Sequence, residues 1–236
     1  MPRIASSAWR SLRRHSYRLS RDLFSHGSYA LNGLDLQLIE IIRPSQQGGF
    51  YVELGANDGL RQSNSYLLQH RFGWDGLLIE PSPIRFWEGV DNRSFGRKPA
   101  IRCAACVSNA YSMPFVEMEY SDLMTVAFGL TLSREQVLEQ AEKGSPFLDS
   151  SSQRHRFGAL ARTLTSLLEE VSAPADFDLL SLDVEGNELA VLQGLDFSCY
   201  RPSWVLAECR DDTVSHYLHD VGYLMHSVLN DSGSYQ

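Results

Sequence analysis

The chain has 236 residues, of which 43% are hydrophobic and 21% charged, and this composition excludes a disordered, collagen-like or coiled-coil protein. No apolar run approaches the ~20 residues that span a bilayer, which excludes an integral membrane protein. The net charge of −8 disfavours a nucleic-acid partner, and four cysteines are too few for a disulfide scaffold and favour a reducing, cytoplasmic compartment.

The first 29 residues form a basic arm on an otherwise acidic chain. Six arginines precede Asp22, the first acidic residue. Ala8, Leu12, Leu19 and Leu23 fall on one helical face, which predicts an amphipathic helix. Three interpretations stay open: a helix packed on the domain, a contact with an anionic membrane surface or a partner, and a transit peptide.

Helices and strands alternate from residue 31 onward. Apolar runs bounded by glycine or proline predict strands, and 3.6-residue spacing predicts helices. The expected strands are residues 50–54, 76–80, 100–107, 177–186, 204–208 and 223–229. The expected helices are residues 34–42, 63–70, 163–171, 188–195 and 213–221.

This alternation predicts βαβ units and a mostly parallel, doubly wound sheet with helices on both faces. Residues 30–236 are therefore expected to form one α/β domain. Residues 122–153 are less regular, with helical patches. The chain is expected to end in a short hairpin, with residues 234–236 as its second strand.

Ligands of such sheets bind beyond the carboxyl ends of the strands. The first strand ends in the turn Gly55-Ala56-Asn57-Asp58-Gly59, in which glycines allow a close backbone approach. The turn lacks the G-x-G-x-x-G pattern of dinucleotide sites and the Gly-Lys-Ser/Thr of a P-loop. Glu80 ends the second strand, where a carboxylate can accept hydrogen bonds from ribose hydroxyls. A ribose-binding carboxylate without phosphate-binding features fits S-adenosylmethionine.

The fourth strand ends in Asp183-Val184-Glu185-Gly186, and the two carboxylates point the same way on an extended segment. They are candidates for the base that removes a proton from an acceptor, or for binding the acceptor. A divalent cation held by these residues, or a cap on the following helix formed by Glu185, are the alternatives. Cys103 and Cys106 face opposite sides of a strand, so no metal site is expected there.

The sequence resembles the FkbM-type methyltransferases. The resemblance is carried by FYVELGANDGLRQSNSY and GWDGLLIEP, then by DLLSLDVEGNELAVLQG, with Asn92-Arg93 and Thr163-Leu164 between them. It implies a class I, Rossmann-like methyltransferase fold with S-adenosylmethionine as the methyl donor. Family members commonly modify hydroxyl groups of natural products or glycans.

The resemblance also implies roles for individual residues. Residues expected to bind the cofactor are Glu53, Gly55, Ala56, Asn57, Gly59, Ser63, Asn64, Glu80, Pro81, Cys106, Val107 and Asp183. Asp183 and Glu185 are the expected catalytic residues, and no metal ligand is assigned.

The leading hypothesis is an O-methyltransferase that acts on a small molecule or a glycan. The alternative is a binding or trafficking module that keeps the fold without catalysis. A nucleotide-dependent oxidoreductase is disfavoured because the dinucleotide pattern is absent.

Overall fold

The computed structural model describes residues 27–45, 48–148 and 153–229. Nearly all of the basic arm therefore lies outside the described residues. Within the described ranges, no helix has both the length and the apolar composition needed to cross a membrane.

The main sheet has five parallel strands in the order β3-β2-β1-β8-β9. Its strands are β1 (Phe50–Leu54), β2 (Asp75–Ile79), β3 (Ala100–Arg102), β8 (Leu179–Leu182) and β9 (Trp204–Ala207). Residues 51–54, 76–79 and 179–182 are buried, as expected for strands covered on both faces. The expected α/β class with a mostly parallel sheet is confirmed.

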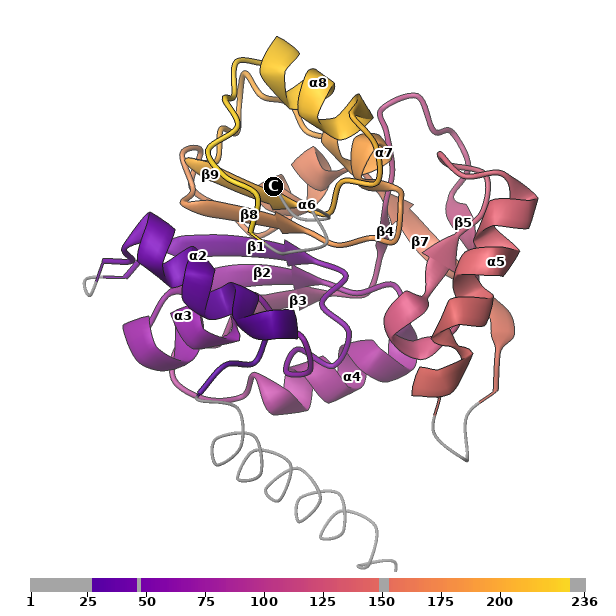
Figure 1. Ribbon diagram of the computed structural model, residues 1–236, viewed down its shortest axis with the longest axis horizontal. Coiled ribbons are helices and arrows are strands. Elements are labelled where there is room, and N and C mark those ends of the chain that lie inside the picture. Colours follow the sequence, from indigo (N-terminus) through magenta and orange to yellow (C-terminus); the bar gives the residue numbers. More distant parts are fainter. Residues whose placement is uncertain (1–26, 46–47, 149–152, 230–236) are drawn as a thin grey trace, which may run out of the picture.

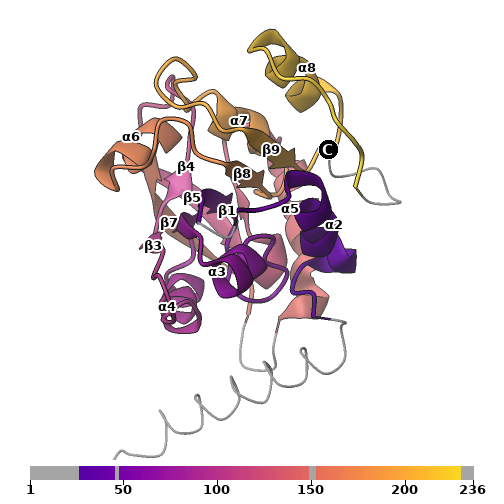
Figure 2. The same cartoon turned by 90° about the vertical axis from the view of Figure 1, so that its left-hand side faces the viewer.

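Helices pack on both faces of this sheet (Figure 1 and Figure 2). One face carries η1 (Leu31–Gly33), α2 (Leu34–Ile42), α3 (Tyr66–Phe72) and α4 (Pro83–Asn92). The other carries α6 (Leu164–Glu170), α7 (Glu188–Leu192) and α8 (Thr213–Asp220). Val52 and Leu54 of β1 belong to the core under α6 and α7, whereas Tyr51 joins the core under α2 and α3. Successive side chains of β1 therefore serve opposite faces.

The expected helix at residues 34–42 is confirmed at both ends. Helix α4 was not among the expected helices, because Pro81 and Pro83 closely follow β2 and mark its end. Pro83 instead occupies the first turn of α4. A proline there costs no intrahelical hydrogen bond, and its fixed φ suits the helix.

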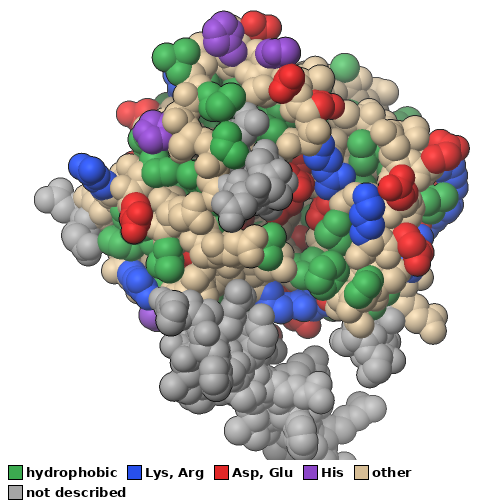
Figure 3. Space-filling model, viewed as in Figure 1, with side chains coloured by type: hydrophobic (Ala, Val, Ile, Leu, Met, Phe, Trp, Pro, Cys, Tyr) green, Lys and Arg blue, Asp and Glu red, His purple; other side chains and the backbone are tan. Residues whose placement is uncertain are grey.

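A second, mostly antiparallel sheet stands beside the carboxyl ends of the main sheet. Its order is β4-β7-β5-β6, with strands β4 (Ala105–Cys106), β5 (Phe115–Tyr120), β6 (Val126–Ala127) and β7 (His155–Arg162). The helices of this layer are η2 (Asp122–Met124), α5 (Arg134–Gly144) and η3 (Ser145–Phe147). Figure 3 shows acidic side chains in the recess between this layer and the main sheet with its helices.

The strand expected at residues 100–107 is corrected to two short strands in different sheets. β3 pairs with β2, and β4 pairs with β7. Two residues, Cys103 and Ala104, carry the chain from one sheet to the other. A continuous apolar run has no local feature that marks a change of partner, and the partner of β4 lies more than 50 residues further along the chain.

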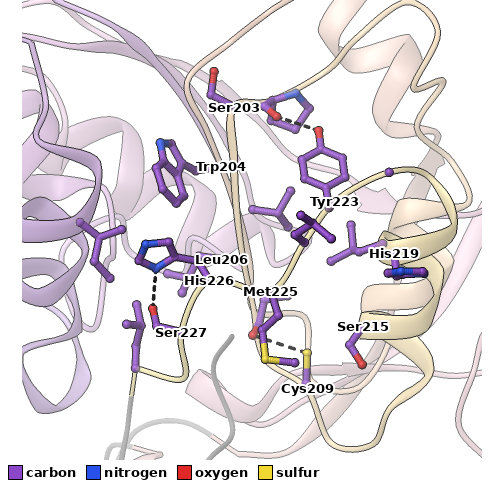
Figure 4. A pocket seen from close by; sticks show the side chains of 18 of the residues that line it. Ser203, Trp204, Leu206, Cys209, Ser215, His219, Tyr223, Met225, His226 and Ser227 are labelled. Atoms are coloured by element: carbon purple, nitrogen blue, oxygen red, sulfur yellow. Dashed lines mark hydrogen bonds between the residues drawn. The ribbon is translucent and has the colours of Figure 1, made fainter.

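The strand expected at residues 223–229 is also corrected, because this tail has no regular secondary structure. A cavity of about 860 Å³ separates it from β9, and Figure 4 shows the side chains that line it. Side chains hold the tail in place: Tyr223 donates a hydrogen bond to the carbonyl oxygen of Pro202 at 2.7 Å, and His226 meets Trp204 edge to face. The tail therefore contacts the β9 region through side chains and not through a ladder of backbone hydrogen bonds. The second strand of the expected hairpin, residues 234–236, lies outside the described residues.

Candidate active site

A cavity of about 280 Å³ lies at the carboxyl ends of β1, β2 and β8. The main sheet contributes the loop after each of these strands, and the second layer contributes apolar side chains such as Met118, Met124 and Phe147. Ligands of open α/β sheets bind at this position. The cavity, and not the larger one beside β9, is therefore the candidate active site.

The glycine turn after β1 forms the floor of this cavity. Gly55 has φ +73°, and a Cβ atom there would overlap the carbonyl oxygen of Asp183. The turn therefore packs directly on the end of β8, which only glycine permits. At the far end of the turn, Gly59 lies against Gly89 of α4.

Glu80 ties the turn to the end of β2. One carboxylate oxygen accepts a hydrogen bond from the backbone N–H of Asn57 at 2.9 Å, and the other accepts one from the N–H of Ser82 at 2.8 Å. Burial raises the pKa of Glu80 to about 7, although both hydrogen bonds favour the charged form. Glu80 is among the residues that line the cavity.

Glu53 lies behind the turn and does not line the cavity. It accepts hydrogen bonds from the hydroxyls of Ser63 and Ser65, from the N–H of Asn64 and from Arg93. Its direction follows from strand alternation, since its neighbours Val52 and Leu54 serve the opposite face.

Arg93 is the hub of this network and is only 1% exposed. Besides Glu53, its guanidinium donates to the carbonyl oxygen of Gly59 at 2.5 Å, to the hydroxyl of Tyr51 and to the side chain of Gln69. Glu53, Ser63 and Asn64 thus support the glycine turn from below and are not among the residues that line the cavity.

Asp122 fixes the opposite wall of the cavity. Its carboxylate accepts hydrogen bonds from Arg61 at 3.1 Å and from the side chain of Asn57 at 3.3 Å, and forms an ion pair with Arg85 at 2.8 Å. Asp122 joins the second layer to the turn after β1. Asp122 was not among the expected site residues, because a single aspartate in an irregular stretch carries no local sign of these partners.

The carboxylates after β8 lie in an acidic cluster. Asp183 and Glu185 both line the cavity, and Glu208 lies nearby at the end of β9. Arg210 donates to Glu185 at 2.6 Å and to Glu208 at 3.4 Å. Burial, together with the charges of Asp183 and Glu208, raises the pKa of Glu185 to about 8.

The described residues contain no cluster of three histidine, cysteine, aspartate or glutamate side chains that could hold a metal ion. Cys106 lines the cavity, whereas the thiol of Cys103 donates to the carbonyl oxygen of Pro81. His155 begins β7 and is not among the residues that line the cavity.

Backbone strain gathers around this cavity. Seven described residues other than glycine have positive φ. Four of them line the cavity: Asn57, Gln62, Asp122 and Glu185. Such conformations cost about 1–3 kcal/mol each and cluster at functional sites.

The family model described as Methyltransferase FkbM domain matches residues 53–226. The chain belongs to the FkbM methyltransferase family. No curated protein matches the chain at a significant level. The resemblance to this family is confirmed. The matched range begins at the end of β1 and extends beyond β9, so it includes the loops after β1, β2 and β8 that line the cavity.

In this FkbM methyltransferase the structure brings some of the expected site residues together and separates others. Those that line the cavity are Gly55, Asn57, Glu80, Pro81, Cys106, Asp183 and Glu185. Those that do not are Glu53, Ala56, Gly59, Ser63, Asn64 and Val107. Ala56 and Val107 are buried side chains of the same loops.

Proposed function

We propose that this FkbM methyltransferase uses S-adenosylmethionine and methylates a hydroxyl group of a small molecule or glycan. The observation that supports S-adenosylmethionine as the methyl donor is the position of Glu80. Its carboxyl group is buried and held by two backbone N–H groups, and the residue lines the cavity beside a glycine turn. This arrangement suits the two hydroxyls of a ribose. Bound there, S-adenosylmethionine would supply the methyl group.

The charges of the cavity support a cationic donor. Asp183, Glu185 and Glu80 line it. Among the cavity-lining residues, the one cation is Arg61, and it is already engaged with Asp58 and Asp122. A sulfonium or ammonium group of S-adenosylmethionine bound beside Glu80 and Glu185 would favour their charged forms, whereas the phosphates of a polyanion would be repelled by those charges. An acceptor without phosphate groups therefore suits this site better than a nucleic acid.

The residues after β8 supply the acid–base chemistry of the proposal. A hydroxyl acceptor must lose a proton as the methyl group is transferred. A carboxylate whose pKa lies near neutrality is suited to accept a proton at that stage. Glu185 has this property, and Asp183 lies two residues before it on the same cavity wall. We assign these two residues to the acceptor side and the turn with Glu80 to the donor side.

Calorimetric titration of the purified chain with S-adenosylmethionine and S-adenosylhomocysteine tests the donor. The Glu80→Ala variant should bind about 10- to 100-fold more weakly, because hydrogen bonds to a charged group contribute about 1.5–3 kcal/mol. Glu139→Ala is the matched control, since Glu139 on α5 is 71% exposed. NAD should not bind. Equal affinity of the two variants, or no binding to the folded wild type, would refute the donor assignment.

A further inference from the structure

Glu185 is held in an unusual way for a residue of a cavity wall. Its backbone has φ +60°, and its side chain is 10% exposed. One carboxylate oxygen, Oε2, accepts two hydrogen bonds: from the side-chain amide of Gln140 at 2.5 Å and from the guanidinium of Arg210 at 2.6 Å. Two donors on one oxygen fix the plane of the carboxyl group.

The other oxygen of Glu185, Oε1, accepts no hydrogen bond from the described residues. Because Glu185 lines the cavity, this oxygen is the one left for a ligand. The two oxygens therefore differ, since Oε2 is anchored to the protein and Oε1 has no hydrogen-bond donor among the described residues.

Gln140 comes from outside the main sheet. It lies on α5, 45 residues before Glu185, and is buried with Val137 and Ala141 on the face of α5 that packs on Val126 and Phe128. Its contact with Glu185 therefore connects the second layer to the loop after β8. The position of α5 is itself secured by a capping box formed by Ser133 and Gln136.

Arg210 balances the charge of the acidic cluster. The charged groups that face Glu185 are Asp183 from its own loop, and Glu208 and Arg210 from the end of β9. Gln140 is the uncharged donor from α5. Arg210 is shared between two carboxylates, so it does not neutralise the cluster, and Glu185 retains its proton to a higher pH than an isolated glutamate.

We propose that Gln140 and Arg210 are positioning residues, which hold Glu185 by Oε2 so that Oε1 faces the methyl acceptor. The second layer thus completes the acceptor side of the site through Gln140, in addition to covering the cavity. This inference rests on the proposed function for its purpose, but its test requires neither donor nor acceptor.

The test is a pH titration of the Glu185 carboxyl carbon by NMR, in protein labelled with ¹³C at the glutamate side chain. Glu185→Gln assigns the resonance. Arg210→Met should raise the titration midpoint by about 1–3 pH units, because a neighbouring cation is lost. Gln140→Leu should raise it by less, because a donor to the charged form is lost. Arg210→Lys should restore most of the wild-type midpoint, and Glu139→Gln should leave it unchanged.

Circular dichroism of each variant establishes that it is folded, and Gln140→Leu carries the test where Arg210→Met does not fold. The inference is overturned if the midpoint of Glu185 stays at the wild-type value in folded Gln140→Leu and Arg210→Met. Binding of S-adenosylmethionine, measured on the same samples, reports on the donor site separately. If the midpoint shifts as expected in Arg210→Met and Gln140→Leu but the wild type binds no S-adenosylmethionine, the proposed function is contradicted and the positioning of Glu185 is supported.

Discussion

Replacing Glu80 by glutamine should change the pH dependence of stability in a way that the structure specifies. The side chain of Glu80 is buried, and its pKa is raised by burial to about 7 from an ordinary 4.5. The folded protein therefore keeps this proton over a pH range in which the unfolded chain has lost it. Stability must fall as the pH rises from about 4.5 through about 7, and level off above that.

The magnitude follows from the same two values. At about 1.4 kcal/mol per pH unit, the full change is about 3 kcal/mol, most of it between roughly pH 5 and pH 8. Glutamine removes this titration but keeps only one acceptor oxygen for the N–H groups of Asn57 and Ser82. One buried donor is then unsatisfied, which costs about 1–3 kcal/mol at every pH.

Urea denaturation of both proteins in steps across that pH range measures the effect. Titration of other carboxyl groups, including Glu185, is common to both proteins and cancels in the difference. Glu80→Gln should be clearly less stable than the wild type at pH 5 and should approach or exceed it at pH 8. A difference in unfolding free energy that stays constant across the range would show that burial does not hold the proton on Glu80, and would refute the reasoning.

Three further substitutions test the packing around the site by urea denaturation. Gly55→Ala should destabilise the protein far more than Gly96→Ala. Both glycines have positive φ, which costs about 1–2 kcal/mol for alanine, but of the two only Gly55 has backbone where the new Cβ atom would lie. Equal destabilisation by the two substitutions would contradict this packing. Asp122→Asn should cost about 3 kcal/mol because it removes the charge of the buried carboxylate that Arg61 and Arg85 share, whereas Asp75→Asn, which breaks an exposed ion pair, should cost under about 1 kcal/mol. Arg93→Met should cost about 3–5 kcal/mol, since a buried carboxylate loses its cation, and a cost below 1 kcal/mol would show that Arg93 is not the hub of that network.

The main sheet was predictable where local sequence determines the structure. Strands β1 and β2 are short apolar runs that begin or end at glycine or proline, and helix α2 has apolar residues at helical spacing. These signals are local because both strand faces and one helix face must be apolar when covered. The tail at residues 223–229 shows the limit: it has a strand-like apolar pattern, but it makes side-chain contacts with β9 in place of a ladder.

The pairing of β5 with β7 in the second layer was not predictable, for a physical reason, although the helical patches expected within residues 122–153 include α5. The paired residues of β5 and β7 lie 35 to 45 positions apart in the chain, and the outer side of these strands carries both charged and apolar side chains, such as Glu117, Phe115 and Leu160. Such strands are stabilised by cross-strand pairs, which exist only once the register is formed.

The candidate site divides in the same way. Sequence alone determined the residues at strand ends, Gly55, Glu80, Asp183 and Glu185, because the carboxyl ends of parallel strands must meet at one edge of the sheet. Only the tertiary structure decided which carboxyl groups face the cavity. Strand alternation turns Glu53 away into the Arg93 network, and the second layer sets the partners of Glu185. Burial and the partners brought by distant segments fix the charge state of a carboxyl group, and neither is a property of its neighbours in the chain.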